Sequence, residues 1–130
     1  MQEGRSLFND GKFWEAHEAW EQVWRRHEEP WRYFVQGLIQ AAAAHHQLRR
    51  GIRHGAIKHL KNALAKLDSA PAELGGLDLE DFRLKLRHLE VELERARVSE
   101  FDRLRRAGFA RLNNRGVPEK RGPAPPPVDV

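Results

Sequence analysis

The fold class follows from the segment Gly11-Lys-Phe-Trp-Glu-Ala-His-Glu-Ala-Trp-Glu-Gln-Val-Trp24. Its apolar residues recur at steps of three and four, and they are Phe13, Ala16, Trp20, Val23 and Trp24. This spacing places them on one side of an α-helix, where they can face a core. The glycine at its start suits the left-handed conformation that ends a preceding helix. The segment therefore predicts a helix over 12–27 that follows a short helix carrying Leu7 and Phe8.

The pattern occurs a second time further along the chain. A shift of 40 residues superposes Gly11 on Gly51, Ala16 on Ala56, Trp20 on Leu60, Val23 on Ala63 and Trp24 on Leu64. Each unit is predicted as a helix, a glycine turn and a helix, and Pro30 suits the start of the helix over 30–50. Such units are tetratricopeptide-like and are predicted to stack, although the full tetratricopeptide pattern is absent.

A long C-terminal helix is predicted to begin near Leu79 and to have two apolar faces. One face carries Phe82, Leu86, Leu89 and Leu93, and the other carries Leu84, Val91 and Val98. The first is expected to pack on the core. The second is expected to meet the segment containing Phe101, Leu104 and Phe109, or a second copy of the chain in a homodimer. Because no run of alternating β-branched residues occurs, the fold class is all-α, a compact bundle of two stacked helix-turn-helix units plus this long helix.

The positive charge is confined to one part of the chain. The net charge is +4, yet residues 1–96 hold fifteen basic and fifteen acidic residues, whereas 97–130 hold eight and four. We therefore expect a helical domain over 1–112 and a basic, proline-rich, disordered tail over 113–130. Nucleic-acid binding is one alternative for this segment, through Arg103, Arg105, Arg106, Arg111 and Arg115.

Composition excludes several classes of protein and site. Without cysteine, the chain forms no disulfide, no thiolate zinc site and no cysteine nucleophile. No apolar run is long enough for a membrane span, and the N-terminus lacks the apolar stretch of a signal peptide. The sequence therefore predicts a soluble, cytoplasmic protein that does not insert into membranes.

Polar residues lie unusually close to the aromatic stripe of the first long helix. His17 falls on the stripe itself, where its imidazole needs a hydrogen-bond partner. If the next helix runs antiparallel, it brings Gln36, Gln40 and either His45 or His46 to this cluster. The predicted ligand-binding residues are Trp14, Glu15, His17, Glu18, Glu21, Gln36 and Gln40. In the alternative interpretation, His17 is a hydrogen-bonded core residue and the glutamates form a solvated helix face.

The same segment contains part of a metal-site pattern. His17 and Glu21 are four residues apart and share a helix face, and Glu18 is placed like the general base of a zinc peptidase. The second histidine of that motif is missing, so a third ligand would have to come from His45 or His46. A metal-assisted hydrolase is therefore an alternative. The leading interpretation is a non-enzymatic domain that binds a peptide or small polar ligand, with no cofactor and no metal.

Two blocks of the sequence resemble a known family. They are Phe13-Trp14-Glu15-Ala16-His17-Glu18-x-Trp20-Glu21 and Gln36-Gly37-Leu38-Ile39-Gln40. The chain over 4–67 is similar to the bacterial and archaeal family named domain of unknown function 309. The resemblance implies a compact all-helical fold and no established activity, substrate or cofactor. It places the family's signature residues at Glu15, His17, Glu18, Trp24, Gln36 and Gln40.

Overall fold

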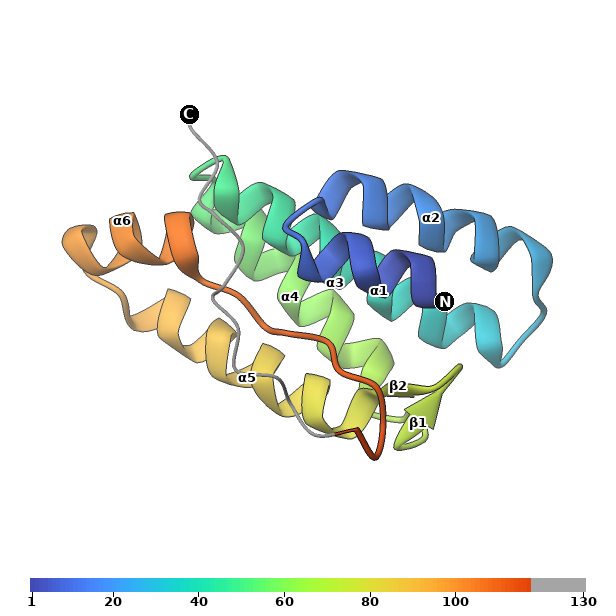
Figure 1. Cartoon of the computed structure of the whole chain (residues 1–130). Coiled ribbons are helices and arrows are strands. Elements are labelled where there is room, and N and C mark those ends of the chain that lie inside the picture. The colour runs from blue at the N-terminus through green and yellow to red at the C-terminus, as the bar shows by residue number, and fades with distance from the viewer. Residues whose placement is uncertain (118–130) are drawn as a thin grey trace.

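A computed structural model describes residues 1–117 of the 130-residue chain. The described part contains six helices and one small hairpin, and Figure 1 shows their arrangement. They are α1 (Gln2–Asn9), α2 (Phe13–Arg26), α3 (Trp31–Arg49), α4 (Arg53–Leu67), β1 (Glu73–Leu74), β2 (Leu77–Asp78), α5 (Leu79–Arg95) and α6 (Val98–Ala107). The mostly helical fold predicted from the sequence is confirmed. Residues 118–130, which include most of the predicted tail, lie outside the described residues.

The two glycine turns have the same backbone geometry. Gly11 has φ 81° and Gly51 has φ 75°, so both adopt the left-handed conformation that glycine favours. The amide of Lys12 donates to the carbonyl of Leu7 at 2.9 Å, and the amide of Ile52 donates to that of Gln47 at 3.0 Å. These bonds close the last turn of the preceding helix in the same way. The predicted helix–glycine turn–helix units are therefore present as α1–α2 and α3–α4.

The core lies where these two units meet α5. Phe13, Ala16 and Trp20 of the α2 stripe are buried, and Val23 and Trp24 pack against the core from its edge. The predicted core face of α5 is likewise buried, and it consists of Phe82, Leu86, Leu89 and Leu93. In α1, Gly4 lies directly against the Trp20 ring, so that any side chain at position 4 would overlap the indole. Close packing of α1 on α2 therefore requires a glycine at this position.

The predicted long C-terminal helix is two helices. The backbone becomes extended at Ala96, with φ −64° and ψ 133°, and α6 then packs against α3. No glycine or proline lies at 96–97, so the sequence carries no local signal for this break. The outer face of α5 is not covered by the segment predicted to cover it. Leu84 is 65% exposed and Val98 is 88% exposed, whereas Leu104 is buried and Phe109 packs against the core.

The loop before α5 contains the two-stranded hairpin β1–β2. Glu73 pairs with Asp78, and Leu74 pairs with Leu77. The two residues between the strands, Gly75 and Gly76, both have positive φ, as the favoured two-residue hairpin turn requires. The sequence predicts only a loop here, because strands of two residues are too short to produce an alternating pattern.

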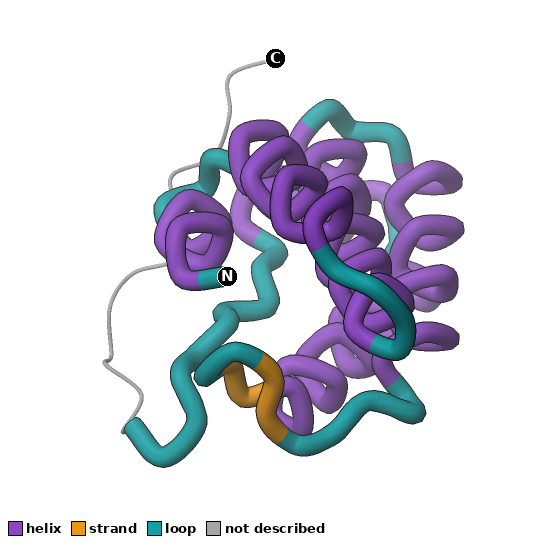
Figure 2. The backbone as a smooth tube through the Cα atoms, turned by 90° about the vertical axis from the view of Figure 1, so that its right-hand side faces the viewer, coloured by secondary structure: helices purple, strands orange, loops and turns teal. Residues whose placement is uncertain are grey.

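After α6 the chain crosses the molecule in an extended segment, residues 108–115, which we call the strap. Figure 1 shows it running between α1 and α5 to the hairpin, and Figure 2 shows it as loop beside the helices. The amide of Asp78 donates to the carbonyl of Asn113 at 2.8 Å, and the amide of Arg115 donates to that of Gly76 at 2.8 Å. Residues 113–115, which the sequence predicts to be part of the tail, are therefore bound to the hairpin.

Candidate functional site

The helices α2, α3 and α4 pack against each other in chain order and carry a cluster of aromatic and polar side chains. We call this cluster the imidazole face, and it consists of Trp14, His17, Glu21, Gln40, His46 and His59. The ring of Trp14 stacks on that of His17, with centroids 4.9 Å apart and planes 7° from parallel. Trp14 also lies 5.5 Å from the ring of His46. Trp14 is 49% exposed, so its indole is accessible at the edge of the face.

Hydrogen bonds order part of this face. Nδ1 of His59 lies 2.7 Å from Oε1 of Gln40, so the proton of the neutral imidazole is on Nδ1 and Nε2 remains an acceptor. Nε2 of His17 lies 3.7 Å from Oε1 of Glu21, one helical turn further on. The other ring nitrogen of His17, Nδ1, is buried and has no partner among the described residues. A buried polar atom of this kind is uncommon in folded proteins.

Two imidazoles of the face, those of His46 and His59, resist protonation. Burial lowers the pKa of His46, and the nearby Arg50 and His17 lower it further, while Glu15 raises it. The pKa of His59 is lowered by burial first, then by Lys58 and His17. Both side chains are therefore neutral near pH 7, and each offers one donor and one acceptor. The shared influence of His17 shows that the three imidazoles form one electrostatic group.

His45, the other histidine that sequence spacing left open, belongs to the core. It is fully buried among Phe8, Phe13 and Phe109. Its Nδ1 donates to the carbonyl of Ala41 at 2.8 Å, and its Nε2 accepts from the amide of Ala110 at 3.1 Å. Both ring nitrogens are satisfied, and burial lowers the pKa of His45 to about 3. His45 therefore cannot serve the predicted site, whereas His46 points towards it.

The predicted site residues divide between two surfaces. Trp14, His17, Glu21 and Gln40 lie on the imidazole face, and Gln36 is half-buried one turn before Gln40 on α3. Glu15 and Glu18 instead line a depression between α1 and α2, together with Glu3, Leu7, Val23 and Arg26. Helical geometry explains this division, because positions 15 and 18 are turned away from position 17 around α2.

The ligand set of the hydrolase alternative does not assemble. His17 and Glu21 share a helix face as predicted, but His45 is in the core and His46 contacts the face through Trp14. Among residues 1–117, no group of three or more histidine, aspartate or glutamate side chains has an arrangement that could hold a metal ion. Glu18, the predicted base, lines the other depression.

Three arginines of the basic C-terminal segment form ion pairs with carboxylates. Arg105 and Arg106 contact Asp102 at 3.1 and 3.5 Å, and Arg115 contacts both Asp78 and Glu80 at 3.2 and 3.3 Å. Arg103 lines a groove between α5 and α6, and the carbonyl of Arg111 accepts from Lys85. These carboxylates reduce the positive field that the predicted nucleic-acid contacts would need.

One member of the face, His59, is not predicted by the sequence pattern. His59 lies on α4, 19 residues beyond Gln40, and no motif connects the two positions. Only the packing of α4 against α3 brings their side chains together. The repeat superposes His59 on Ala19, so it carries no signal for this contact either.

Comparisons with known proteins agree with the predicted resemblance. Residues 1–59 match the model of the family described as domain of unknown function (DUF309), so the resemblance is confirmed for this segment. The chain is also 32% identical, over 88 residues or 66% of its length, to an uncharacterized protein of Aquifex aeolicus (strain VF5). That match spans 26% of the Aquifex protein, about a quarter of its length. No solved structure matches the chain significantly. No helix in the described part is long and apolar enough to cross a membrane.

Proposed function

We propose that the DUF309 segment of this chain, together with α4, forms a binding module that takes a short peptide on the imidazole face. The observation that carries the proposal is the half-exposed indole of Trp14, which stacks on the ring of His17 and lies beside that of His46. A ligand that packs on this indole can also hydrogen bond to the partly exposed, neutral imidazoles of His46 and His59.

The chemistry of the face favours a peptide over a charged small molecule. Near pH 7, His46 and His59 are neutral. The bond between Gln40 and His59 uses Nδ1 of the imidazole, so it does not occupy the acceptor Nε2. Neutral donors and acceptors match main-chain amides, which carry one donor and one acceptor per residue. The exposed part of Trp14 offers an apolar surface for one side chain of the peptide. A small polar ligand with the same pattern of donors and acceptors is the second candidate.

A selection of random peptides displayed on phage tests the proposal with the full chain as bait. Selected peptides are synthesised with a fluorophore, and their affinity is measured by anisotropy for wild type, Trp14→Ala and Gln40→Ala. We expect each substitution to weaken binding about tenfold or more, because it removes a ring contact or a hydrogen-bonding amide.

Two control variants make the result specific to the face. Trp31→Ala removes another exposed tryptophan, and Glu18→Ala removes the α2 carboxylate that lines the other depression. Both should leave the affinity unchanged. Peptides that bind equally well to Trp14→Ala and Gln40→Ala would contradict the proposal, as would a selection that enriches no peptide.

A further inference from the structure

The helices α5 and α6 border a groove of about 570 Å³ that is separate from the imidazole face. Figure 1 shows the chain turning back after the break at Ala96, so that α6 returns along α5. The lining of the groove comes from both helices and from the first residues of the strap. Volumes of about 300–1,000 Å³ are typical of sites that take small molecules. The groove is therefore large enough for a ligand of that kind.

The floor of the groove is apolar. Leu89 and Leu104 line it and are almost fully buried. Phe109 also lines it and is held by Phe8, with ring centroids 5.6 Å apart. Leu84 lies beside them with 65% of its surface exposed. An alkyl chain that covers these side chains removes apolar surface from water, which favours binding.

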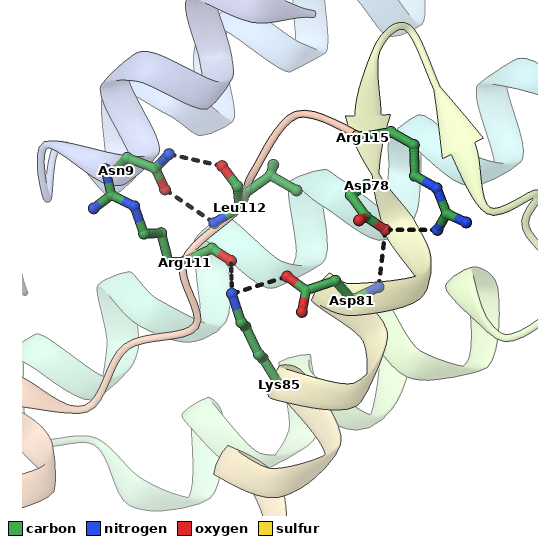
Figure 3. Close-up of polar contacts among 7 residues, drawn as sticks. All are labelled: Asn9, Asp78, Asp81, Lys85, Arg111, Leu112 and Arg115. Carbon is green, nitrogen blue, oxygen red and sulfur yellow. Dashed lines mark hydrogen bonds and ion pairs between the residues drawn. The ribbon is translucent and has the colours of Figure 1, made fainter. Parts of the chain in front are cut away.

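Three polar side chains of the lining have partners within the protein. Nζ of Lys85 contacts Oδ2 of Asp81 at 2.8 Å and donates to the carbonyl of Arg111 at 3.3 Å, as Figure 3 shows. Nε2 of His88 lies 3.1 Å from Oε1 of Glu92, one helical turn further on. Because these contacts occupy Lys85, His88 and Glu92, the charge that remains for a ligand comes from elsewhere in the lining.

Arg103 is the remaining charged residue of the lining. Its side chain is exposed and forms no ion pair or hydrogen bond among residues 1–117. Its neighbours Arg105 and Arg106 differ, because both contact Asp102, at 3.1 and 3.5 Å. A guanidinium binds one carboxylate through two parallel N–H···O bonds. The groove therefore presents one cation, without a carboxylate partner in the described part of the chain, beside an apolar floor.

The size of the groove distinguishes between occupants. Ten residues line it, whereas a stable protein interface uses about 20–30 residues of each partner. Its lining on α5 extends from Leu84 to Glu92, about 12 Å along the helix axis. A fully extended chain advances about 1.2 Å per bond. An unbranched chain of about ten carbons therefore matches the length of the groove.

We propose that the groove between α5 and α6 binds a fatty acid of about ten carbons, with its carboxylate on Arg103 and its alkyl chain over Leu84, Leu89 and Phe109. The single negative charge of this ligand complements the one unpaired cation of the lining. Its chain complements the apolar floor. The site shares no residue with the imidazole face, so it is independent of the peptide site proposed there.

Titration of decanoate into the ¹⁵N-labelled full chain, below the micelle concentration, tests the proposal by NMR. We expect saturable shifts of the backbone amides that border the groove. Arg103→Gln should weaken binding about threefold to fivefold, the upper part of the range for an exposed charge pair. Arg106→Gln is the matched control, since Arg106 pairs with Asp102, and its affinity should equal that of wild type. Equal affinities of wild type and Arg103→Gln for decanoate would overturn the proposal.

A second pair of variants tests the apolar floor. Leu84→Asp places a carboxylate beside the alkyl chain and should weaken binding at least about tenfold. Because Leu84 is 65% exposed, the helices should remain folded, which circular dichroism checks. Val98→Asp is the control, since Val98 is 88% exposed and does not line the groove. Decanoate that binds Leu84→Asp as tightly as wild type would contradict the proposal.

Decan-1-ol, which has the same chain and no charge, tests the head group. It should bind wild type as weakly as decanoate binds Arg103→Gln, and Arg103→Gln should not distinguish the two ligands. Decanoate shifts confined to the imidazole face would argue against the groove. A dimer in sedimentation velocity that Leu84→Asp dissociates would also overturn the proposal, because a second copy of the chain would then cover the groove.

Discussion

At the scale of single residues, His45 shows how one buried side chain can look like a functional one. Its two ring nitrogens bond to Ala41 and Ala110, which fixes the neutral tautomer with its proton on Nδ1. A second proton on Nε2 would place two N–H groups against each other, between Phe8 and Phe13. His45 is therefore a structural link between α3 and the strap, and its protonation opposes folding.

This arrangement predicts loss of stability in acid. Burial holds the pKa of His45 at about 3 in the folded chain, below its usual 6.5. Between these values the unfolded state binds the proton and the folded state does not, so stability is full above pH 6.5 and falls as the pH drops towards 3. We expect His45 to account for about 2 kcal/mol of the stability lost between pH 7.5 and pH 5.

Urea unfolding of wild type and His45→Gln at several pH values measures this contribution. Glutamine can still accept the amide of Ala110 but does not titrate. His46 and His59 are present in both proteins, so the difference between the two pH dependences isolates His45. Parallel pH dependences for the two proteins would show that His45 does not control acid stability.

At the scale of elements, Asp78 connects the hairpin, α5 and the strap. Its Oδ1 accepts from the amide of Asp81 at 3.1 Å, which caps the first turn of α5, and from Arg115 at 3.2 Å, as Figure 3 shows. The side chain of an N-cap aspartate satisfies an amide that has no partner within the helix. Asp78 thus stabilises the start of α5 and the end of the strap together.

Asp78→Ala should lower the free energy of unfolding by about 1–2 kcal/mol, because it removes the cap and an ion pair. Asp68→Ala is the control, since the carboxylate of Asp68 at the C-terminal end of α4 pairs with Arg87 at 2.6 Å and both side chains are exposed. We expect that change to be within about 0.5 kcal/mol of zero. Thermal unfolding followed by circular dichroism distinguishes the two, and equal effects would argue against the capping role.

Most elements were predictable because their signals are local. The stripe of α2, the glycines at 11 and 51 and the apolar face of α5 each follow from spacing within one segment. The break at Ala96 was not predictable, since contacts of α6 with α3, rather than a glycine or proline, set its position. The candidate site was predictable only in part for the same reason. Trp14, His17 and Glu21 share one helix face, but His59 joins them through helix packing.

At the scale of the whole molecule, the strap ties the first helix to the last residues of the described chain. Asn9 and Leu112 are 103 positions apart, and their paired hydrogen bonds are buried. Gln2 also contacts Asn114 and the carbonyl of Gly75, so α1, the hairpin and the strap are joined at one end of the molecule. This closure indicates that the described residues unfold as one cooperative unit.

Asn9→Ala should therefore destabilise the entire fold by roughly 2–4 kcal/mol, since it leaves a buried amide and carbonyl of Leu112 without partners. Tryptophan fluorescence and far-ultraviolet circular dichroism should report the same lowered urea midpoint. Asn62→Ala, on the surface of α4, should leave the midpoint unchanged. Two separated transitions in Asn9→Ala would show that the strap detaches without unfolding the helices.

The link between Asn9 and Leu112 also sets an order of events during synthesis. A ribosome adds roughly 5–20 residues per second, so about 5–20 s separate the appearance of these two residues. Throughout that interval Phe8 and Phe13 lack the covering ring of Phe109, and the Nε2 of His45 lacks the amide of Ala110. The nascent chain therefore leaves these aromatic rings of its core without the Phe109 contact until synthesis has passed the strap.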